Sequence, residues 1–141
     1  MGRIFIHLHG KPKDKSLSSL LQMYLTRLES ESVKIVEHND NLSKNEYFNK
    51  LTNLTKNANL ILFEEKGANH NSIEFSNLIK SWKLEQEDTH LAIGPAEGFP
   101  KHSFSKISLS KLTFPHELAA VILIEQIYRS TQIIKGTKYH K

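Results

Sequence analysis

The chain has 141 residues and a formal net charge of +4, and its length fits one compact domain spanning residues 1–141. The hydrophobic share of 38% is ordinary for a soluble protein. The chain contains no cysteine, which excludes disulfides and thiolate metal sites. The basic balance favours a polyanionic partner such as RNA, and a charged surface that only keeps the protein in solution fits it equally well.

In the N-terminal half, apolar residues recur first with the period of a strand and then with that of a helix. Ser16 and Ser43 are the expected N-caps of the first two helices, because a serine hydroxyl can accept a hydrogen bond from the first helical turn. The predicted elements, in chain order, are a strand over residues 3–8, a helix over 16–29, a strand over 33–37 and a helix over 44–57.

The second half begins with an apolar strand over residues 59–63, where the hydrophobic residues are continuous rather than alternating. This pattern is typical of a strand buried on both faces, as in a parallel sheet. We predict next a loop over residues 64–71, a helix over 72–84 capped by Ser72, strands over 90–93 and 107–109, and a helix over 115–131. Strands that alternate with helices throughout predict an α/β fold, with a mainly parallel sheet flanked by helices.

No apolar run approaches the roughly 18 residues of a membrane-spanning helix. The N-terminal residues also lack the long apolar stretch and the small-residue cleavage site of a secretory signal. We therefore expect a cytoplasmic protein with no membrane partner.

Ligands of open parallel sheets bind at the carboxyl ends of the strands. Three predicted strand ends carry candidate residues, at 63–67, 91–99 and 108–118. Gly94 and Gly98 in the second allow close approach of a ligand, whose adenine edge could be bound by free backbone groups. A plain turn explains the same glycines, and the chain has no dinucleotide, phosphate-loop or nucleophile-elbow motif.

Two other features have simpler interpretations. His7 and His9 lie on one side of the first strand, which could begin a metal site, but no partner motif with metal-ligand spacing follows. We interpret them as hydrogen-bonded histidines and expect no metal. Trp82 shares a helix face with Phe75 and Leu78 and is expected in the core.

Three C-terminal segments carry a family resemblance: Leu-Thr-Phe-Pro-His-Glu-Leu at 112–118, Glu-Gln-Ile-Tyr-Arg at 125–129 and Tyr-His-Lys at 139–141. They closely resemble the C-terminal block of the ribosomal RNA large subunit methyltransferase H family, the YbeA-type members of the SPOUT class. Residues 93–98 are similar to the Gly-Gly-Pro-Glu-Gly loop of that family, and residues 63–67 to its Leu-Asp-x-x-Gly strand end.

The resemblance implies a domain whose C-terminal third is threaded into a trefoil knot, a homodimer, and a ribosomal RNA substrate that is methylated at N3 of a pseudouridine. It also implies S-adenosylmethionine (S-adenosyl-L-methionine) as cofactor, held mostly by backbone groups of three loops. By position, the cofactor-binding residues are Phe63, Gly94, Leu109, Ser110, Lys111, Leu112, Thr113 and Phe114.

Methyl transfer to N3 requires a base that removes its proton, and a group with a pKa near neutral suits this task. His140 is the candidate base, Tyr139 lies beside it, and Lys141 is placed to stabilise negative charge or hold phosphate. A flexible charged tail without a catalytic role is the alternative.

The chain departs from the family pattern at several positions. Pro95-Ala96 replaces Gly-Pro, Ala120 and Lys141 each replace an arginine, and Ala68 replaces a lysine. Because several of the replaced residues are cations, a non-catalytic RNA-binding relative is one alternative function. An unrelated small-ligand-binding α/β protein is the other.

Overall fold

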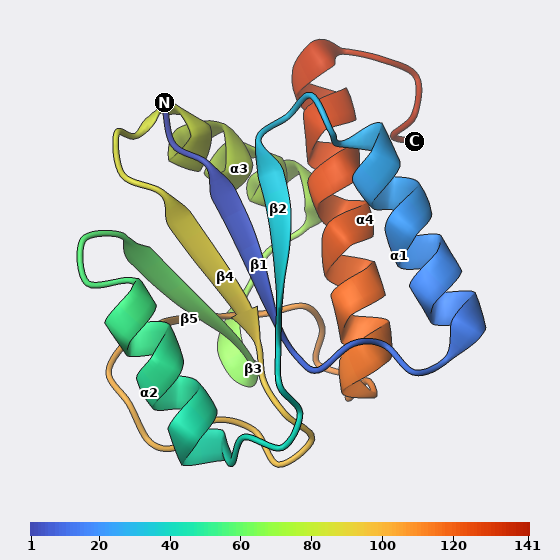
Figure 1. The fold of residues 1–141 in the computed structure, drawn as a ribbon. Coiled ribbons are helices and arrows are strands. Elements are labelled where there is room, and N and C mark those ends of the chain that lie inside the picture. The colour runs from blue at the N-terminus through green and yellow to red at the C-terminus, as the bar shows by residue number, and fades with distance from the viewer.

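A five-stranded sheet with helices on both faces forms the protein in the computed structural model, which describes residues 1–141 (Figure 1). The elements are β1 Ile4–His9, α1 Lys15–Arg27, β2 Val33–His38, α2 Lys44–Leu54, β3 Asn59–Asn69, α3 Ser72–Leu84, β4 Thr89–Ile93, β5 Ser105–Ser108 and α4 His116–Lys135. The predicted α/β class is confirmed.

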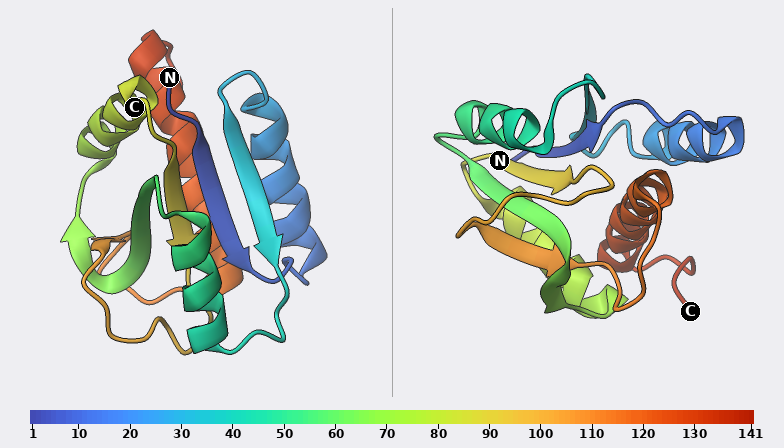
Figure 2. Two further views of the ribbon diagram at one scale, coloured as in Figure 1. Left: turned by 60° about the vertical axis from the view of Figure 1, so that its left-hand side comes forward. Right: turned by 90° about the horizontal axis from the view of Figure 1, so that it is seen from below.

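The strand order is β2-β1-β4-β3-β5 and every neighbouring pair is parallel. Helices α1, α3 and α4 cover one face of the sheet and α2 covers part of the other (Figure 2). The central strand β4 is buried at all five of its residues. Residues 60–63 of β3 are buried as well, as the continuous apolar pattern of residues 59–63 predicts for a parallel sheet. Because all strands run the same way, their carboxyl ends meet at one edge.

Two hydrophobic clusters hold the helices on the sheet. The larger cluster joins β1, β4 and β3 to α1, α3 and α4, and includes Trp82 and Phe75 with their rings edge to face. The smaller one packs Tyr47 and Leu51 of α2 on Leu62 and Ala92. The predicted core position of Trp82 is therefore confirmed.

Two predicted helix caps are wrong by one or two residues. The cap of α1 is Asp14 rather than Ser16, and its carboxylate accepts hydrogen bonds from the backbone N–H groups of Ser16 and Leu17. Asn71 rather than Ser72 caps α3. The Ser43 cap of α2 is confirmed, since its hydroxyl accepts from the N–H of Glu46 while the Glu46 carboxylate accepts in return.

The largest difference lies in β3, which continues to Asn69 through most of the predicted loop over residues 64–71. Its pairing with β5 shifts between Phe63 and Ala68, and a side chain at Gly67 would collide with the backbone of Ile107. Hydrogen bonding to a neighbouring strand has thus overridden a polar local sequence.

Smaller differences concern where elements end. The first two helices end at Arg27 and Leu54, earlier than predicted, and β5 covers 105–108 instead of 107–109. Helix α4 runs four residues beyond the predicted end at 131 and stops where Gly136 adopts a left-handed conformation, with φ of 74°. None of the four helices combines the length and the hydrophobicity that a membrane span requires.

Candidate active site

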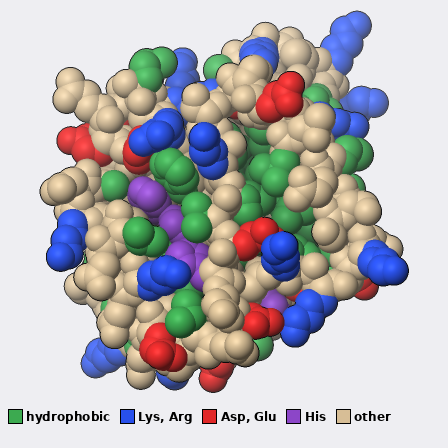
Figure 3. Space-filling view, viewed as in Figure 1, with side chains coloured by type: hydrophobic (Ala, Val, Ile, Leu, Met, Phe, Trp, Pro, Cys, Tyr) green, Lys and Arg blue, Asp and Glu red, His purple; other side chains and the backbone are tan.

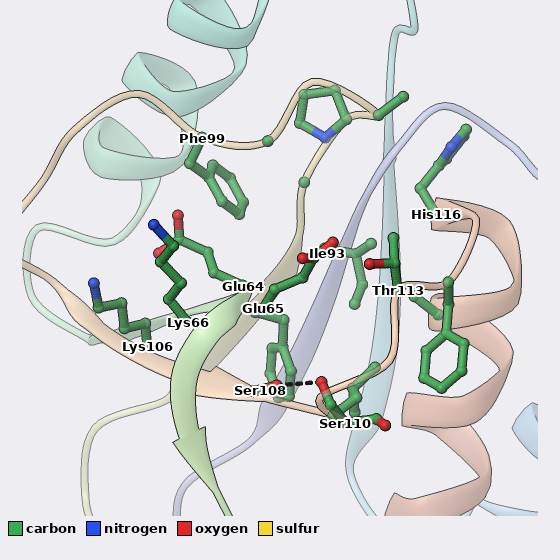
Figure 4. A pocket seen from close by; sticks show the side chains of 18 of the residues that line it. Glu64, Glu65, Lys66, Ile93, Phe99, Lys106, Ser108, Ser110, Thr113 and His116 are labelled. Carbon is green, nitrogen blue, oxygen red and sulfur yellow. Dashed lines mark hydrogen bonds between the residues drawn. The ribbon is translucent and has the colours of Figure 1, made fainter.

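A cavity of about 420 Å³ lies at the carboxyl ends of β3, β4 and β5 (Figure 4). Three segments that follow these strands line it, and the first turn of α4 closes one side. The lining residues are Phe63, Glu64, Glu65, Lys66, Ile93, Gly94, Pro95, Ala96, Glu97, Gly98, Phe99, Lys106, Ser108, Leu109, Ser110, Leu112, Thr113, Phe114, His116 and Ala119.

The fold brings seven of the eight predicted cofactor-binding residues to this cavity. Lys111 is the exception, because its side chain is exposed and does not line the cavity. The seven are Phe63, Gly94, Leu109, Ser110, Leu112, Thr113 and Phe114. Segments more than 40 residues apart in sequence therefore meet at the strand ends, as the resemblance implies for a cofactor site.

Helix α2 packs against the segment that follows β4 and holds it in place. The buried Tyr47 hydroxyl donates a hydrogen bond to the carbonyl oxygen of Ile93 at 2.7 Å, and the Tyr47 ring stacks on Phe99 with centroids 5.9 Å apart. Burial raises the pKa of Tyr47 far above its usual range, so the hydroxyl stays protonated and keeps donating. The Phe99 ring in turn packs closely on Gly94, so a β-carbon at position 94 would require the ring to shift by a few tenths of an ångström.

Gly94→Val should abolish binding of S-adenosylmethionine while the far-ultraviolet circular dichroism spectrum stays unchanged. A β-carbon at position 94 would lie 3.0 Å from the Phe99 ring, so a branched side chain must push Phe99 out of the cavity wall. Calorimetric titration of the variant with the cofactor measures the effect. An affinity equal to that of the wild type would remove this segment from the binding site.

Glu64 and His102 connect β3 to the segment that closes the cavity. His102 Nδ1 accepts a hydrogen bond from the backbone N–H of Phe104 at 3.1 Å, so Nε2 carries the proton and donates it to the Glu64 carboxylate at 2.7 Å. The His102 side chain is 5% exposed and contacts the rings of Phe48 and Phe99. This pair fixes residues 94–104 relative to β3.

Glu64→Ala should weaken cofactor binding about tenfold. The variant loses one charge-assisted hydrogen bond of about 1.5–3 kcal/mol, and part of this loss lowers the stability of the fold while the rest disorders the loop at the cavity and lowers the affinity. Glu64→Gln keeps an acceptor and should bind nearly as the wild type does. Glu31→Ala is the matched control, since Glu31 pairs with Lys83 and Lys135 away from the cavity. It should lower the thermal midpoint without changing the affinity, and a tenfold loss there would contradict the role of Glu64.

Several lining residues were not among those predicted to bind the cofactor. Ser108 donates through Oγ to the carbonyl oxygen of Ser110 at 2.6 Å, and Ser110 Oγ accepts from the N–H of Leu112 at 3.0 Å, which shapes the third segment (Figure 4). Lys106 and His116 lie at the wall. The strand-end rule pointed to the segments, but nothing local marked His102, which only the tertiary fold brings to Glu64.

The predicted catalytic residues Tyr139, His140 and Lys141 do not line the cavity. The Tyr139 hydroxyl donates to Glu125 Oε2 at 2.9 Å, and its ring contacts Tyr128 edge to face at 4.9 Å. These contacts place the tail beside the second half of α4, whereas the cavity lies at the first turn of that helix. Within one chain, the tail and the cavity are therefore apart.

The hydrogen bonds of the tail limit what each residue can do there. Arg129 Nη1 lies 3.1 Å from His140 Nδ1, and because a guanidinium only donates, neutral His140 carries its proton on Nε2. A base role requires His140 to leave Arg129. Burial and hydrogen bonds with Tyr24 and Glu125 raise the pKa of Tyr139, so Tyr139 remains a protonated donor.

A second group of titratable residues lies across the sheet. His7 Nδ1 is 2.8 Å from His38 Nε2, and His7 Nε2 is 2.7 Å from His90 Nδ1. Histidine side chains form a row on the face seen in Figure 3. Burial, followed by the charges of His90 and His38, lowers the pKa of His7 to about 3. Burial, followed by the charges of Lys50 and His9, lowers that of His38 to about 4. We call His7, His38 and His90 the histidine row. No group of three or more potential ligands is arranged to hold a metal ion.

Sequence comparison places the chain among known proteins. Residues 3–140 match the family described as "Predicted SPOUT methyltransferase". The chain is 33% identical to ribosomal RNA large subunit methyltransferase H of Malacoplasma penetrans, with 99% of each chain covered. It is 38% identical to the protein of that name from Mycoplasmopsis synoviae, with 91% of this chain and 92% of the relative covered.

Structural comparison finds the same fold in two distant proteins. Archaeoglobus fulgidus Nep1 bound to S-adenosylhomocysteine has a TM-score of 0.51 and 14% identity, covering 93% of this chain and 99% of its own. The tRNA (m1G37) methyltransferase of Aquifex aeolicus has a TM-score of 0.52 and 13% identity, covering 92% and 70%. Together with the match over residues 3–140 and the relatives above 30% identity, these findings show that the chain belongs to the SPOUT methyltransferase family.

Proposed function

We propose that this protein transfers a methyl group from S-adenosylmethionine to N3 of a pseudouridine in 23S ribosomal RNA of the large subunit or the whole ribosome. The cavity at the ends of β3, β4 and β5 carries the proposal, because it gathers seven of the residues that the resemblance assigns to the cofactor. The relatives at 33% and 38% identity bear the name ribosomal RNA large subunit methyltransferase H. A cytoplasmic location follows from a ribosomal substrate.

The residues at the cavity fit S-adenosylmethionine. Its volume of about 420 Å³ lies in the usual range of small-molecule sites, roughly 300–1,000 Å³. Phe63 and Ile93 offer apolar walls for a purine. Three glutamates and two lysines share the lining, which leaves one carboxylate in excess for a cationic sulfonium. The bound cofactor supplies an activated methyl group on a sulfonium, so the protein has to position the acceptor and take up its proton.

His140 is the proposed base, Tyr139 fixes the tail through Glu125, and Lys141 stabilises the charge that develops on the deprotonated base of the RNA. Because the tail does not reach the cavity of its own chain, we propose a homodimer in which the tail of one copy serves the cavity of the other. An exposed apolar side chain at the cavity supports this proposal. Leu112 lines the cavity and is 71% exposed, so a second copy could cover it. The C-terminal trefoil knot stays a prediction.

A dimer should be observed by light scattering at micromolar concentration, and a monomeric mass across that range would contradict the proposal. Mixing two inactive variants gives a sharper measurement. Gly94→Val disables the cavity and deletion of 139–141 disables the tail, so only a mixed dimer contains one intact combination. Mixing them after mild unfolding and refolding should restore a fraction of the wild-type rate, while each variant refolded alone stays inactive.

Methyl incorporation into ribosomes that lack the modification tests the function directly. Labelled S-adenosylmethionine should transfer its methyl group to these ribosomes and not to fully modified ones. Binding of cofactor and ribosome without transfer would identify a non-catalytic RNA-binding relative. Failure to bind the cofactor would leave an unrelated ligand for the cavity.

A further inference from the structure

Two of the three arginines in the chain are neutralised by carboxylates. The Arg3 guanidinium forms two hydrogen bonds with Asp88, including Nη2 to Oδ2 at 3.0 Å. Arg129 forms two with Glu125, including Nη2 to Oε2 at 2.8 Å. Arg27, at the end of α1, is exposed and forms no ion pair. Its charge is therefore available to an external anion.

Two tyrosine rings hold Arg27 in place. The guanidinium carbon lies 5.5 Å from the ring centroid of Tyr24 and 5.4 Å from that of Tyr128, and these two rings are 5.8 Å apart. The side-chain hydrogen bonds made by arginines belong to Arg3 and Arg129, so the N–H groups of Arg27 remain free for an external anion. The two ring contacts restrict the Arg27 side chain before any partner arrives, which reduces the entropy lost on binding.

This arginine belongs to the same cluster as the C-terminal tail. The Tyr128 ring contacts Tyr139 edge to face, and the hydroxyls of Tyr24 and Tyr139 are 3.4 Å apart. The end of α1 and the tail lie beside α4 at the same end of the molecule (Figure 1). Glu125 in this cluster is already bonded to Arg129 and Tyr139, so it does not neutralise Arg27.

The basic side chains on the face shown in Figure 3 have no comparable focus. Lysine and arginine side chains are scattered over this face, with acidic groups between them. A net charge of +4 therefore attracts RNA weakly and from many points. A guanidinium whose N–H groups are free can bind a phosphate at a defined position, because its planar fork of donors matches two phosphate oxygens. Charges spread over the surface provide no such directional contact.

We infer that Arg27, held by Tyr24 and Tyr128, binds a backbone phosphate of the substrate RNA next to the nucleotide that meets the tail. The inference rests on the proposed function for the identity of the RNA. Phosphate contacts fix the register of a nucleic acid and carry little sequence information. Arg27 is accordingly a positioning residue, and its loss affects the binding of the ribosome rather than the binding of the cofactor.

Arg27→Gln should raise KM for unmodified ribosomes about tenfold and leave kcat and the Kd for S-adenosylmethionine close to wild type. The dependence of ribosome binding on salt should weaken by about one unit in log K against log salt, as expected for one lost phosphate contact. Arg27→Lys keeps the charge without the fork and should lie between the two. Lys80→Gln is the matched control, because Lys80 is an exposed cation of α3 without an ion pair, and it should behave as the wild type.

The tyrosines provide a second measurement. Tyr128→Phe keeps the ring under Arg27 and should bind ribosomes normally, whereas Tyr128→Leu removes it and should resemble Arg27→Gln. A merely structural role would change the thermal midpoint in both arginine variants without a change in salt dependence. An unchanged ribosome affinity and salt slope in Arg27→Gln would overturn the inference, and so would a changed oligomeric mass, which would make Arg27 a contact between subunits.

The binding data separate this inference from the proposed function. If the wild type binds ribosomes without methylating them, the proposed function fails, and a weaker, less salt-dependent interaction of Arg27→Gln still supports the phosphate contact. If the wild type methylates and Arg27→Gln matches it in KM and salt slope, only the inference fails.

Discussion

Deletion of Tyr139, His140 and Lys141 should lower the rate of methyl transfer by a factor of about 10² to 10⁴, the usual effect of losing a general base, and leave cofactor affinity unchanged. The two effects are separable because none of these residues lines the cavity. Single-turnover methylation of unmodified ribosomes measures the rate, and calorimetric titration measures the affinity. A deletion variant that methylates at the wild-type rate would show that the tail has no catalytic role.

Single substitutions identify which tail residue is responsible. His140→Ala and His140→Gln should both be slow, because neither side chain can accept a proton at neutral pH. Lys141→Arg should keep full activity, since it retains the charge and adds a fork for phosphate. Tyr139→Phe is the control for packing: it keeps the ring against Tyr128 and removes the hydroxyl with its hydrogen bonds to Glu125 and Tyr24.

Acidification from pH 7 to pH 5 should lower the free energy of unfolding by several kcal/mol through the histidine row. His7 and His38 keep pKa values of about 3 and 4 in the folded protein, against about 6.5 in the unfolded chain. Between these values the unfolded state binds more protons, so stability is full above pH 7 and declines as the pH falls below 6.5, by about 1.4 kcal/mol per pH unit for each histidine.

The hydrogen bonds of the histidine row explain why stability falls, rather than rises, as the pH is lowered. Each of the two bonds between imidazoles accommodates one proton, so protonation of all three rings would set N–H groups against each other in a buried site. Above pH 5, carboxylates with a lowered pKa, such as Glu31 and Asp88, remain ionised. The range between pH 6.5 and 5 therefore isolates the histidines.

Urea unfolding at a series of pH values measures the effect. His7→Gln places one donor and one acceptor between His38 and His90, and its slope with pH should fall by about one proton. His140→Gln removes a histidine outside the row and should keep the wild-type slope. A free energy of unfolding that stays constant between pH 7 and pH 5 would contradict the prediction.

Local sequence predicted a helix cap correctly where neighbouring residues alone decide the structure. It failed where a contact with a distant segment decides between two candidate caps. Ser43 caps α2 as predicted because Glu46 completes the reciprocal hydrogen bonds. At α1 both Asp14 and Ser16 are suitable caps, and the choice falls on Asp14, whose own N–H bonds to Glu117 of α4 together with that of Lys13. That contact spans more than 100 residues and leaves no trace in the local pattern.

The same distinction applies to the site. The rule that ligands bind at strand ends selected the segments around Phe63, Gly94 and Leu109, because parallel topology brings these ends together. It did not select His102, whose pairing with Glu64 depends on the path of residues 94–104. The family resemblance predicted that residues 139–141 act at the cofactor site. In the fold of one chain, these residues do not line the cavity.

The strand order has a consequence for synthesis of the chain. Strand β4 lies between β1 and β3, yet it is made after both, so the sheet has a gap at its centre until residue 93 has left the ribosome. Before then β1 pairs only with β2, while β3 has neither of its neighbours. Since pairing distant strands first requires the closure of long loops, the nascent chain exposes unpaired strand edges and apolar side chains, a state that is open to aggregation.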